Sequence, residues 1–130
     1  MKPITLKAGT DACFTVTDFL YYESEARAGC LRNTDMTFTV GTASGTAEAR
    51  RTFDIKEFRR LLKALEAFSA GDEASLRDAD RGVFLRFETE ENGTLTVTGE
   101  TGENAPFRLA GIGASDLSVF VYRMNLLIPN

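Results

Sequence analysis

The sequence predicts one α+β domain with antiparallel sheets and two helices, in the order β-β-β-β-α-β-β-β-α. Two observations predict this class. Segments with the two-residue alternation of strands recur in both halves of the chain, and each half ends in a segment with the 3.6-residue spacing of an amphipathic helix. The length of 130 residues, with 43% hydrophobic and 26% charged residues, is typical of a single globular domain spanning residues 1–130.

The first half is expected to open with four strands. The segment Ile4–Lys7 predicts a short strand, and Phe14–Tyr22 predicts a long one that is rich in aromatic and β-branched residues. The long strand alternates imperfectly, so either both of its faces are covered or a bulge near Thr17-Asp18 shifts the phase. Residues Glu23–Gly29 are polar and small, and predict a mobile loop.

The next two strands are expected to pair through a turn at Gly41–Gly45. Residues 36–40 alternate cleanly, with Met36, Phe38 and Val40 pointing inward. Ala47–Phe53 has weaker strand propensity and is expected at a sheet edge.

The first helix has the clearest signals. Asp54 is a good N-cap residue, Glu57 completes an acidic capping box, and Phe53 and Phe58 are placed for a hydrophobic staple. Gly71 is expected to end the helix as the C′ glycine. The expected apolar stripe consists of Ile55, Phe58, Leu61, Leu62, Leu65 and Phe68.

The second half is expected to begin with an acidic connection, Asp72–Asp80, followed by a hairpin. A two-residue Asn-Gly loop would put the apolar residues of its two strands on opposite faces. A three-residue loop from Glu91 to Gly93 instead pairs Phe87 with Val97 and makes one face apolar throughout. We therefore expect the three-residue loop, with Gly93 in the left-handed conformation of a G1 bulge. The outer face would then hold Arg86, Glu88, Glu90, Thr94, Thr96 and Thr98.

The chain is expected to end with one more strand and a helix. After a turn at Gly102–Asn104, the strand Pro106–Gly111 leads to a helix capped by Ser115 or Asp116, and Pro129 closes the domain. The apolar stripe of this helix consists of Leu117, Phe120, Val121, Met124, Leu127 and Ile128. Two meander-plus-helix halves indicate a structural pseudo-repeat.

The composition excludes several classes of site. The chain has no histidine, which removes Ser-His-Asp and Cys-His nucleophilic sites and histidine metal ligands. We therefore expect no catalytic residue, no cofactor and no metal. Cys13 and Cys30 are expected to be free thiols, since a hairpin would hold them too far apart for a disulfide. The start of the sequence lacks the apolar core of a signal peptide and no apolar run is long enough for a membrane span, so we expect a cytoplasmic protein.

Acidic residues concentrate in the second half, in a chain whose net charge is −4. This pattern allows two interpretations: an anionic patch that attracts a basic protein partner, or a solvated face that keeps the protein soluble. The candidate patch consists of Glu88, Glu90, Glu91, Glu100 and Glu103.

Two further groups of residues have an alternative interpretation. A basic face on the first helix, formed by Lys56, Arg59, Arg60 and Lys63, is typical of phosphate binding, but also of an ordinary solvent-facing helix side. Stacked aromatic residues on a sheet can bind single-stranded nucleic acid, but basic residues are absent from Phe14–Tyr22, which favours core packing or a dimer interface.

The layout also resembles a known family. The resemblance lies in Arg51-Thr52-Phe53-Asp54-Ile55-Lys56-Glu57-Phe58 leading into a helix, the strand Phe84–Glu88, Phe107 in the last strand, and a terminal helix that ends at Ile128-Pro129. In these features the chain resembles the WapI-type immunity protein family and its uncharacterised relatives, which are small cytoplasmic bacterial proteins found beside contact-dependent toxins. This sequence lacks the tryptophan and the Glu-Pro dipeptide of many members, and no functional residue is carried over.

The resemblance implies a non-catalytic binding module, immunity-like, that binds and blocks a partner toxin. The alternative is a single-stranded nucleic-acid-binding domain, because four strands followed by a helix is the repeat order of the PUR-alpha and Whirly types. The acidic charge balance argues against nucleic acid. A sheet face without a helix would favour a homodimer.

Overall fold

The computed structural model describes residues 2–79, 82–102 and 105–128. Within these residues two four-stranded antiparallel sheets are found, in the orders β1-β2-β3-β4 and β5-β6-β7-β8, together with three helices. The predicted α+β class is therefore confirmed. The elements are β1 (Ile4–Ala8), β2 (Ala12–Tyr21), α1 (Glu23–Arg27), β3 (Thr34–Thr42), β4 (Gly45–Phe53), α2 (Ile55–Glu66), β5 (Glu73–Asp78), β6 (Gly82–Thr89), β7 (Leu95–Glu100), β8 (Pro106–Ile112) and α3 (Ala114–Asn125).

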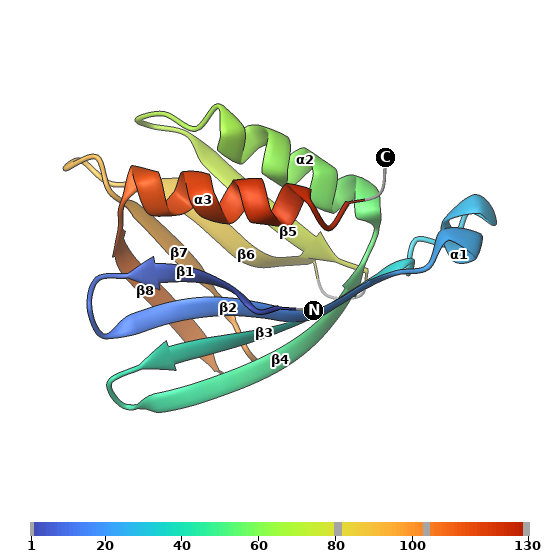
Figure 1. Ribbon diagram of the computed structural model, residues 1–130, viewed down its shortest axis with the longest axis horizontal. Helices are drawn as coiled ribbons and strands as arrows, with labels where there is room; N and C mark the ends of the chain where they lie inside the picture. Colours follow the sequence, from blue (N-terminus) through green and yellow to red (C-terminus); the bar gives the residue numbers. More distant parts are fainter. Residues whose placement is uncertain (1, 80–81, 103–104, 129–130) are drawn as a thin grey trace.

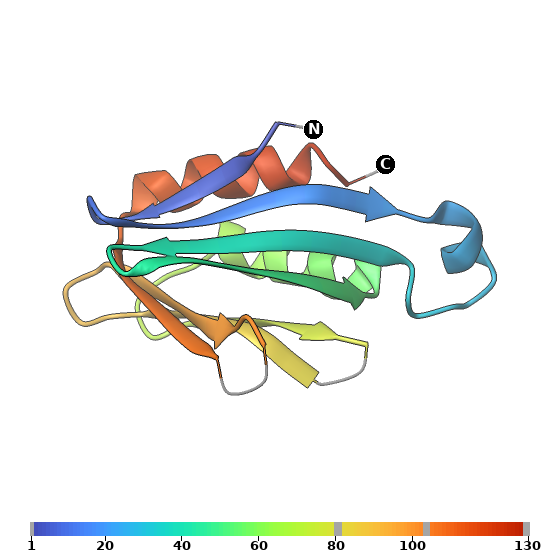
Figure 2. The same ribbon diagram turned by 90° about the horizontal axis from the view of Figure 1, so that it is seen from below.

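The two sheets enclose one core, and α2 and α3 lie side by side along one side of it (Figure 1). Each of these helices packs against the sheet of the other half of the chain. Helix α2 follows the first sheet but packs against β5 of the second, and α3 follows the second sheet but packs against β1 of the first. The view from below shows α1 apart from the other helices, at one end of the first sheet (Figure 2). None of the helices in the described ranges is long and apolar enough to cross a membrane.

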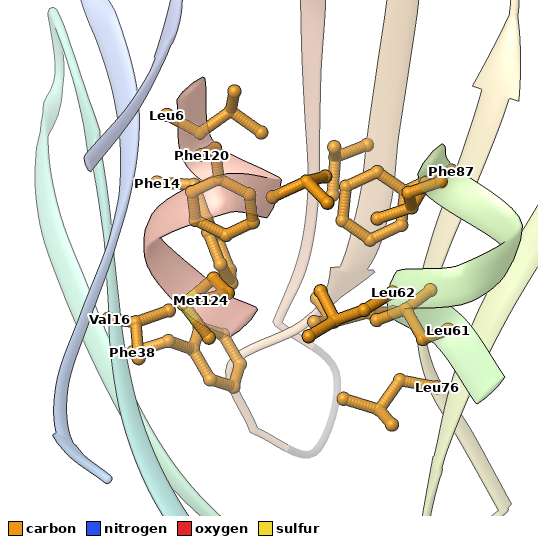
Figure 3. Close-up of a cluster of buried hydrophobic side chains, with 14 of the residues drawn as sticks. Leu6, Phe14, Val16, Phe38, Leu61, Leu62, Leu76, Phe87, Phe120 and Met124 are labelled. Carbon is orange, nitrogen blue, oxygen red and sulfur yellow. The ribbon is translucent and has the colours of Figure 1, made fainter. Parts of the chain in front are cut away.

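Aromatic rings join the two sheets directly. Phe14 and Phe38 of the first sheet are stacked at 5.2 Å, and Phe38 also lies 5.9 Å from Phe84 of the second sheet. Phe120 of α3 meets Phe14 edge-on at 6.2 Å (Figure 3). Phe14 and Phe38 are fully buried, so the prediction that these rings pack in the core is confirmed. Met36 and Val40 are buried beside Phe38, as expected.

A bulge in β2, one of the two alternatives for this strand, explains its imperfect alternation. The β2–β3 register shifts between Thr17 and Leu20, and Asp18 has a positive φ of 50°. One extra residue changes the phase of the strand. Phe19 and Tyr21 therefore pack against the core, whereas Leu20 is 45% exposed.

The start of α2 matches the sequence signals in part. Asp54 is the N-cap residue, and its carboxylate accepts from the backbone N–H of Lys56 at 3.0 Å. The Phe53 and Phe58 rings lie 5.8 Å apart, which confirms the predicted contact. Glu57 forms an ion pair with Arg60. The expected apolar stripe of α2 is buried, with Phe68 partly buried beyond the end of the helix.

The β6–β7 hairpin has the predicted register. Phe87 lies opposite Val97, Thr89 lies opposite Leu95, and Gly93 has a φ of 85°. Phe87 and Val97 are both buried. The terminal helix stripe is also as expected, since Leu117, Phe120, Val121 and Met124 are buried and Leu127 and Ile128 are partly buried.

Two elements were not predicted. The acidic connection expected at Asp72–Asp80 contains β5, in which only Ala74 and Leu76 point into the core. The segment has weak intrinsic strand propensity, and pairing with β6 and packing of α2 hold it in place. The loop expected at Glu23–Gly29 contains α1, a short helix with an ion pair of 2.6 Å between Arg27 and Glu23.

Two predicted helix ends were wrong. Helix α2 ends at Glu66, and a separate turn follows, in which Asp72 N–H donates to the Ser69 carbonyl at 3.0 Å. Gly71 has its positive φ of 87° within that turn and is not a C′ glycine. Helix α3 begins at Ala114 after Gly113, so neither Ser115 nor Asp116 is its cap. Both lie in its first turn, where an acidic side chain is favourable. Pro129 and part of the Gly102–Asn104 turn lie outside the described residues.

Candidate interaction surface

The outer face of the second sheet carries the candidate acidic patch, and no helix of the described chain covers it (Figure 2). Glu88 lies near the end of β6, half-buried, and Glu90 follows two positions later on the same face. Glu91 is exposed in the hairpin loop, and Glu100 is exposed at the far end of β7. Glu103 lies outside the described residues. The fold therefore gathers Glu88, Glu90 and Glu91 around the hairpin and separates Glu100 from them.

One acidic residue of the second half, Glu73, was not placed beside the candidate patch by the sequence analysis. Glu73 of β5 lies directly opposite Glu88 of β6 on the outer face. Like charges in this position destabilise a strand pair. Arg86 compensates part of this repulsion through an ion pair of 3.1 Å with Glu73. Placing Glu73 opposite Glu88 from the sequence would have required β5 to be recognised as a strand.

Arginines are interleaved with these carboxylates. Arg108 of β8 lies 3.3 Å from Glu90, whose carboxylate also accepts from the Thr96 hydroxyl at 2.6 Å. These contacts cover Thr96, which is only 3% exposed although it points outward. The face is therefore mixed in charge, with the carboxylates in excess around the hairpin.

A shallow hollow of about 520 Å³ lies at the hairpin end of this face. The side chains of Glu90 and Glu91 line it together with Arg108. We call it the hairpin hollow, and its lining consists of Glu90, Glu91, Asn92, Thr94, Arg108, Ala110 and Gly111. Its two carboxylates suit a cationic side chain from a partner protein.

The helix layer presents a second surface. The basic residues of α2 are exposed as expected, and Arg60 is paired with Glu57. The outward side of α3 carries an apolar strip that the sequence analysis missed, formed by Val119, Tyr122 and Leu126, which are 50–69% exposed. Their spacing of three and four residues places them on one side of the helix, opposite the buried stripe.

The outer face of the first sheet holds a polar network around Asp35. Its carboxylate accepts from the Thr52 hydroxyl at 2.7 Å and from the Tyr22 hydroxyl at 3.0 Å, and it lies 3.2 Å from the Arg50 guanidinium. Arg50 also donates to the Thr37 hydroxyl at 2.9 Å. The network ties β3 and β4 to Tyr22, which lies between β2 and α1.

These contacts change two pKa values. Burial raises the pKa of the Asp35 carboxyl, but hydrogen bonds from Thr52 and Tyr22 and the charge of Arg50 outweigh it, so the pKa lies below its ordinary value. The pKa of the Tyr22 phenol is raised, chiefly because the phenol donates a hydrogen bond to Asp35. The network therefore favours the form in which Asp35 is ionised and Tyr22 is protonated.

The remaining candidate groups are placed as follows. Cys13 and Cys30 are free and half-buried, which confirms the predicted thiols. Among residues 2–79, 82–102 and 105–128, no cluster of three or more Cys, Asp or Glu side chains is arranged to hold a metal ion.

Comparison of the chain with protein families, curated proteins and solved structures found no match.

Proposed function

We propose that this chain is a non-catalytic, immunity-like binding module of the cytoplasm, which binds a basic protein partner and blocks it by steric occlusion. The observation that carries the proposal is the hairpin hollow on the uncovered face of the second sheet, where the carboxylates of Glu90 and Glu91 lie beside Glu88. A rigid sheet face with an excess of one charge is suited to steering and orienting an oppositely charged partner.

The geometry also favours occlusion over chemistry. Glu90 is held by Thr96 and Arg108, so its carboxylate is fixed in place. Glu91 and Glu100 are exposed and free to meet cationic side chains at the two ends of the face. A toxin whose basic active-site region docked here would be covered by the second sheet.

The nucleic-acid alternative loses most of the aromatic residues on which it depended, since only Tyr22 among Phe14, Phe19, Tyr21, Tyr22 and Phe38 is exposed, and its hydroxyl binds Asp35. Phe14 and Phe38 are enclosed between the sheets and present no ring surface to a base. The structure does supply an eighth strand, which completes two four-strand-plus-helix halves, the repeat order of the alternative. Repeat order is a property of the fold and does not supply a binding face.

The proposal is tested by protection from toxicity. Reading frames next to the gene are expressed singly, and each toxic product is then co-expressed with this chain. We expect growth to be restored by the wild type and not by the double variant Glu90→Lys/Glu91→Lys. The matched control Glu25→Lys changes an exposed charge on α1 and should protect fully. The absence of a toxic neighbour, or of protection by the wild type, would overturn the proposal.

The alternative function has its own measurement. Fluorescence anisotropy with labelled oligo-dT at low salt should show no binding, because the acidic chain repels the phosphate backbone. Micromolar affinity would reject the protein-partner proposal in favour of a nucleic-acid binder.

A further inference from the structure

Within the described residues, the outer edge of β4 in the first sheet is not paired with another strand. β1 is packed by α3 and β8, and β5 is packed by α2, whereas β4 meets β5 only near its C-terminal end. There the Ala79 N–H donates to the Thr52 carbonyl at 2.9 Å. Residues 45–48 at the other end of β4 are all exposed. An open edge of this kind is a template for pairing with another strand.

The direction of the backbone groups follows from the Ala79 contact. It shows that the carbonyl of Thr52 points away from β3. The β3–β4 register has no bulge, so residues two positions apart point their backbone groups the same way. Thr46, Glu48 and Arg50 therefore direct their N–H and C=O groups towards the open edge. The Arg50 carbonyl accepts from the Arg51 side chain at 3.2 Å and keeps a second lone pair.

We infer that this edge pairs with the same edge of a second copy of the chain, through two antiparallel β4 strands related by a two-fold axis at Ala49. In this register Glu48 of each copy lies opposite Arg50 of the other, on the outer face of a continuous sheet. Glu48 is exposed and makes no ion pair within the described residues. The Arg50 side chain is 46% exposed, and donors remain beyond those that bind Asp35 and Thr37.

Charge selects this register from its neighbours. An axis at Glu48 would place two Glu48 carboxylates opposite each other, and an axis at Arg50 would do the same for two guanidiniums. An axis at Ala47 would pair Thr46 with Glu48 and leave Arg50 outside the ladder. Only the axis at Ala49 places Glu48 and Arg50 opposite a residue of opposite charge. Because of the two-fold symmetry, this pair occurs twice in the dimer.

The shape of the edge suits close approach. The inner-face residues at and beside the axis are Ala49, Ala47 and Arg51. In this register each Ala47 lies opposite the Arg51 of the other copy, so a small side chain faces the larger one, whose guanidinium is turned towards Asp78, Glu100 and Phe84 of its own chain. The ladder would contain four backbone hydrogen bonds, all exchanged between Glu48 and Arg50. It would end at Thr52, whose carbonyl already binds Ala79.

Sedimentation velocity over a concentration series tests the dimer. We expect the average mass of the wild type to rise towards that of two chains. Glu48→Arg places two arginines opposite each other and should raise the dissociation constant by about tenfold or more. An equimolar mixture of Glu48→Arg and Arg50→Glu should dimerise again, because every opposed pair then has opposite charges. Glu48→Arg is the safer variant for folding, since Arg50 also binds Asp35 and Thr37.

Two further variants identify the interface. Glu48→Pro removes a backbone donor that points away from β3, so the monomer should fold and fail to dimerise. Tyr122→Asp alters the apolar strip of α3 and should leave the dimer unchanged. Hydrogen exchange of the Glu48 and Arg50 amides should slow as concentration rises. A chain that stays monomeric at all concentrations, or a dimer indifferent to both Glu48→Arg and Glu48→Pro, would overturn the inference.

Discussion

Asn33 is the residue that joins the α1 loop to the start of α2. It is 3% exposed, and its side-chain oxygen accepts from the Ile55 N–H at 2.8 Å. Its amide group donates to the Cys30 carbonyl at 3.0 Å and to the Asp54 carboxylate at 3.2 Å. Asn33 therefore caps the helix from a distant part of the chain while it holds the cap residue Asp54 in place.

Replacing Asn33 by Ala should lower the free energy of unfolding by about 2–3 kcal/mol, because the buried Ile55 N–H and the partly buried Cys30 carbonyl lose their partner. Asp54→Ala removes a single capping bond and should cost about 1 kcal/mol. Urea denaturation followed by circular dichroism measures both values. An Asn33→Ala cost no larger than that of Asp54→Ala would contradict this account of the cap.

The lowered pKa of Asp35 predicts a pH dependence of stability. A carboxyl whose pKa is lower in the folded state stabilises the fold above its unfolded pKa of about 3.9, and this stabilisation is lost as pH falls through the folded value. The stability advantage of the wild type over Asp35→Asn should therefore be larger at neutral pH than in acid. Denaturation at about pH 7 and about pH 3 measures it. An advantage that is the same at both values would show that the charge of Asp35 contributes nothing.

Contacts between residues close in the sequence were predicted at the start of α2, whereas a contact from a distant residue was not. The cap Asp54 and the Phe53–Phe58 contact were predicted because all three residues lie within one helical turn or next to it. Asn33 was not predicted, because it lies 21 residues before Asp54 and no spacing rule connects them.

At the scale of elements, Gly99 allows β7 to pack between β6 and β8. A Cβ atom at this position would lie 2.3 Å from the Phe84 carbonyl oxygen and 2.9 Å from the Phe107 ring. The backbone oxygen cannot move aside without breaking the register of β6.

Gly99→Ala should therefore destabilise the fold by about 2–3 kcal/mol, at the upper end of the cost of overpacking. The control is Gly102→Ala, where a Cβ would meet no atom within 4 Å and the cost should be small. Thermal unfolding of the two variants gives the comparison. Equal melting temperatures would mean that β6 and β8 relax around the added methyl group.

Elements with strong periodicity were predicted, and those held by their neighbours were not. The alternation around Glu91–Gly93 permits one register with a single apolar face, and this register is found. β5 was missed because Glu73–Asp78 offers only two inward residues and depends on β6 for its strand conformation. The C-terminal end of α2 was misplaced because the helix stops at Glu66 and Gly71 belongs to a separate turn. The N-terminal end of α3 was misplaced because the helix begins at Ala114, one residue before the expected cap.

The candidate surface, like the strands and helices, was predicted where residue spacing within one segment determines it and missed where distant segments meet. Alternation along β6 placed Glu88 and Glu90 on the outer face, as found. The contributions of Glu73 and Arg108 depend on strand pairing between distant segments, which residue spacing alone does not predict.

At the scale of the whole molecule, Arg51 links the two halves. Its guanidinium lies 3.7 Å from the Asp78 carboxylate, donates to the Glu100 carbonyl at 3.2 Å and lies over the Phe84 ring at 5.9 Å. Only 13% of the Arg51 side chain and 5% of the Asp78 side chain are exposed. One side chain of the first half thus contacts three residues of the second.

Arg51→Ala should cost about 3 kcal/mol, because it removes a largely buried charge from its partner. The control Arg60→Ala breaks an exposed ion pair within α2 and should cost less than about 1 kcal/mol. Calorimetry should show one transition for each variant, since the halves share a core. Two separate transitions in Arg51→Ala would mean that the halves fold independently.

The exchange of helices has a consequence for the origin of the fold. A lone four-strand-plus-helix unit would have no second sheet on which to bury its helix, and would have to trade that helix with an identical molecule. Duplication and fusion of such a unit would turn an obligate pair into one polypeptide and would release each half to diverge. Each half of the present chain has four strands followed by a helix, and the first half differs by the short α1 between β2 and β3.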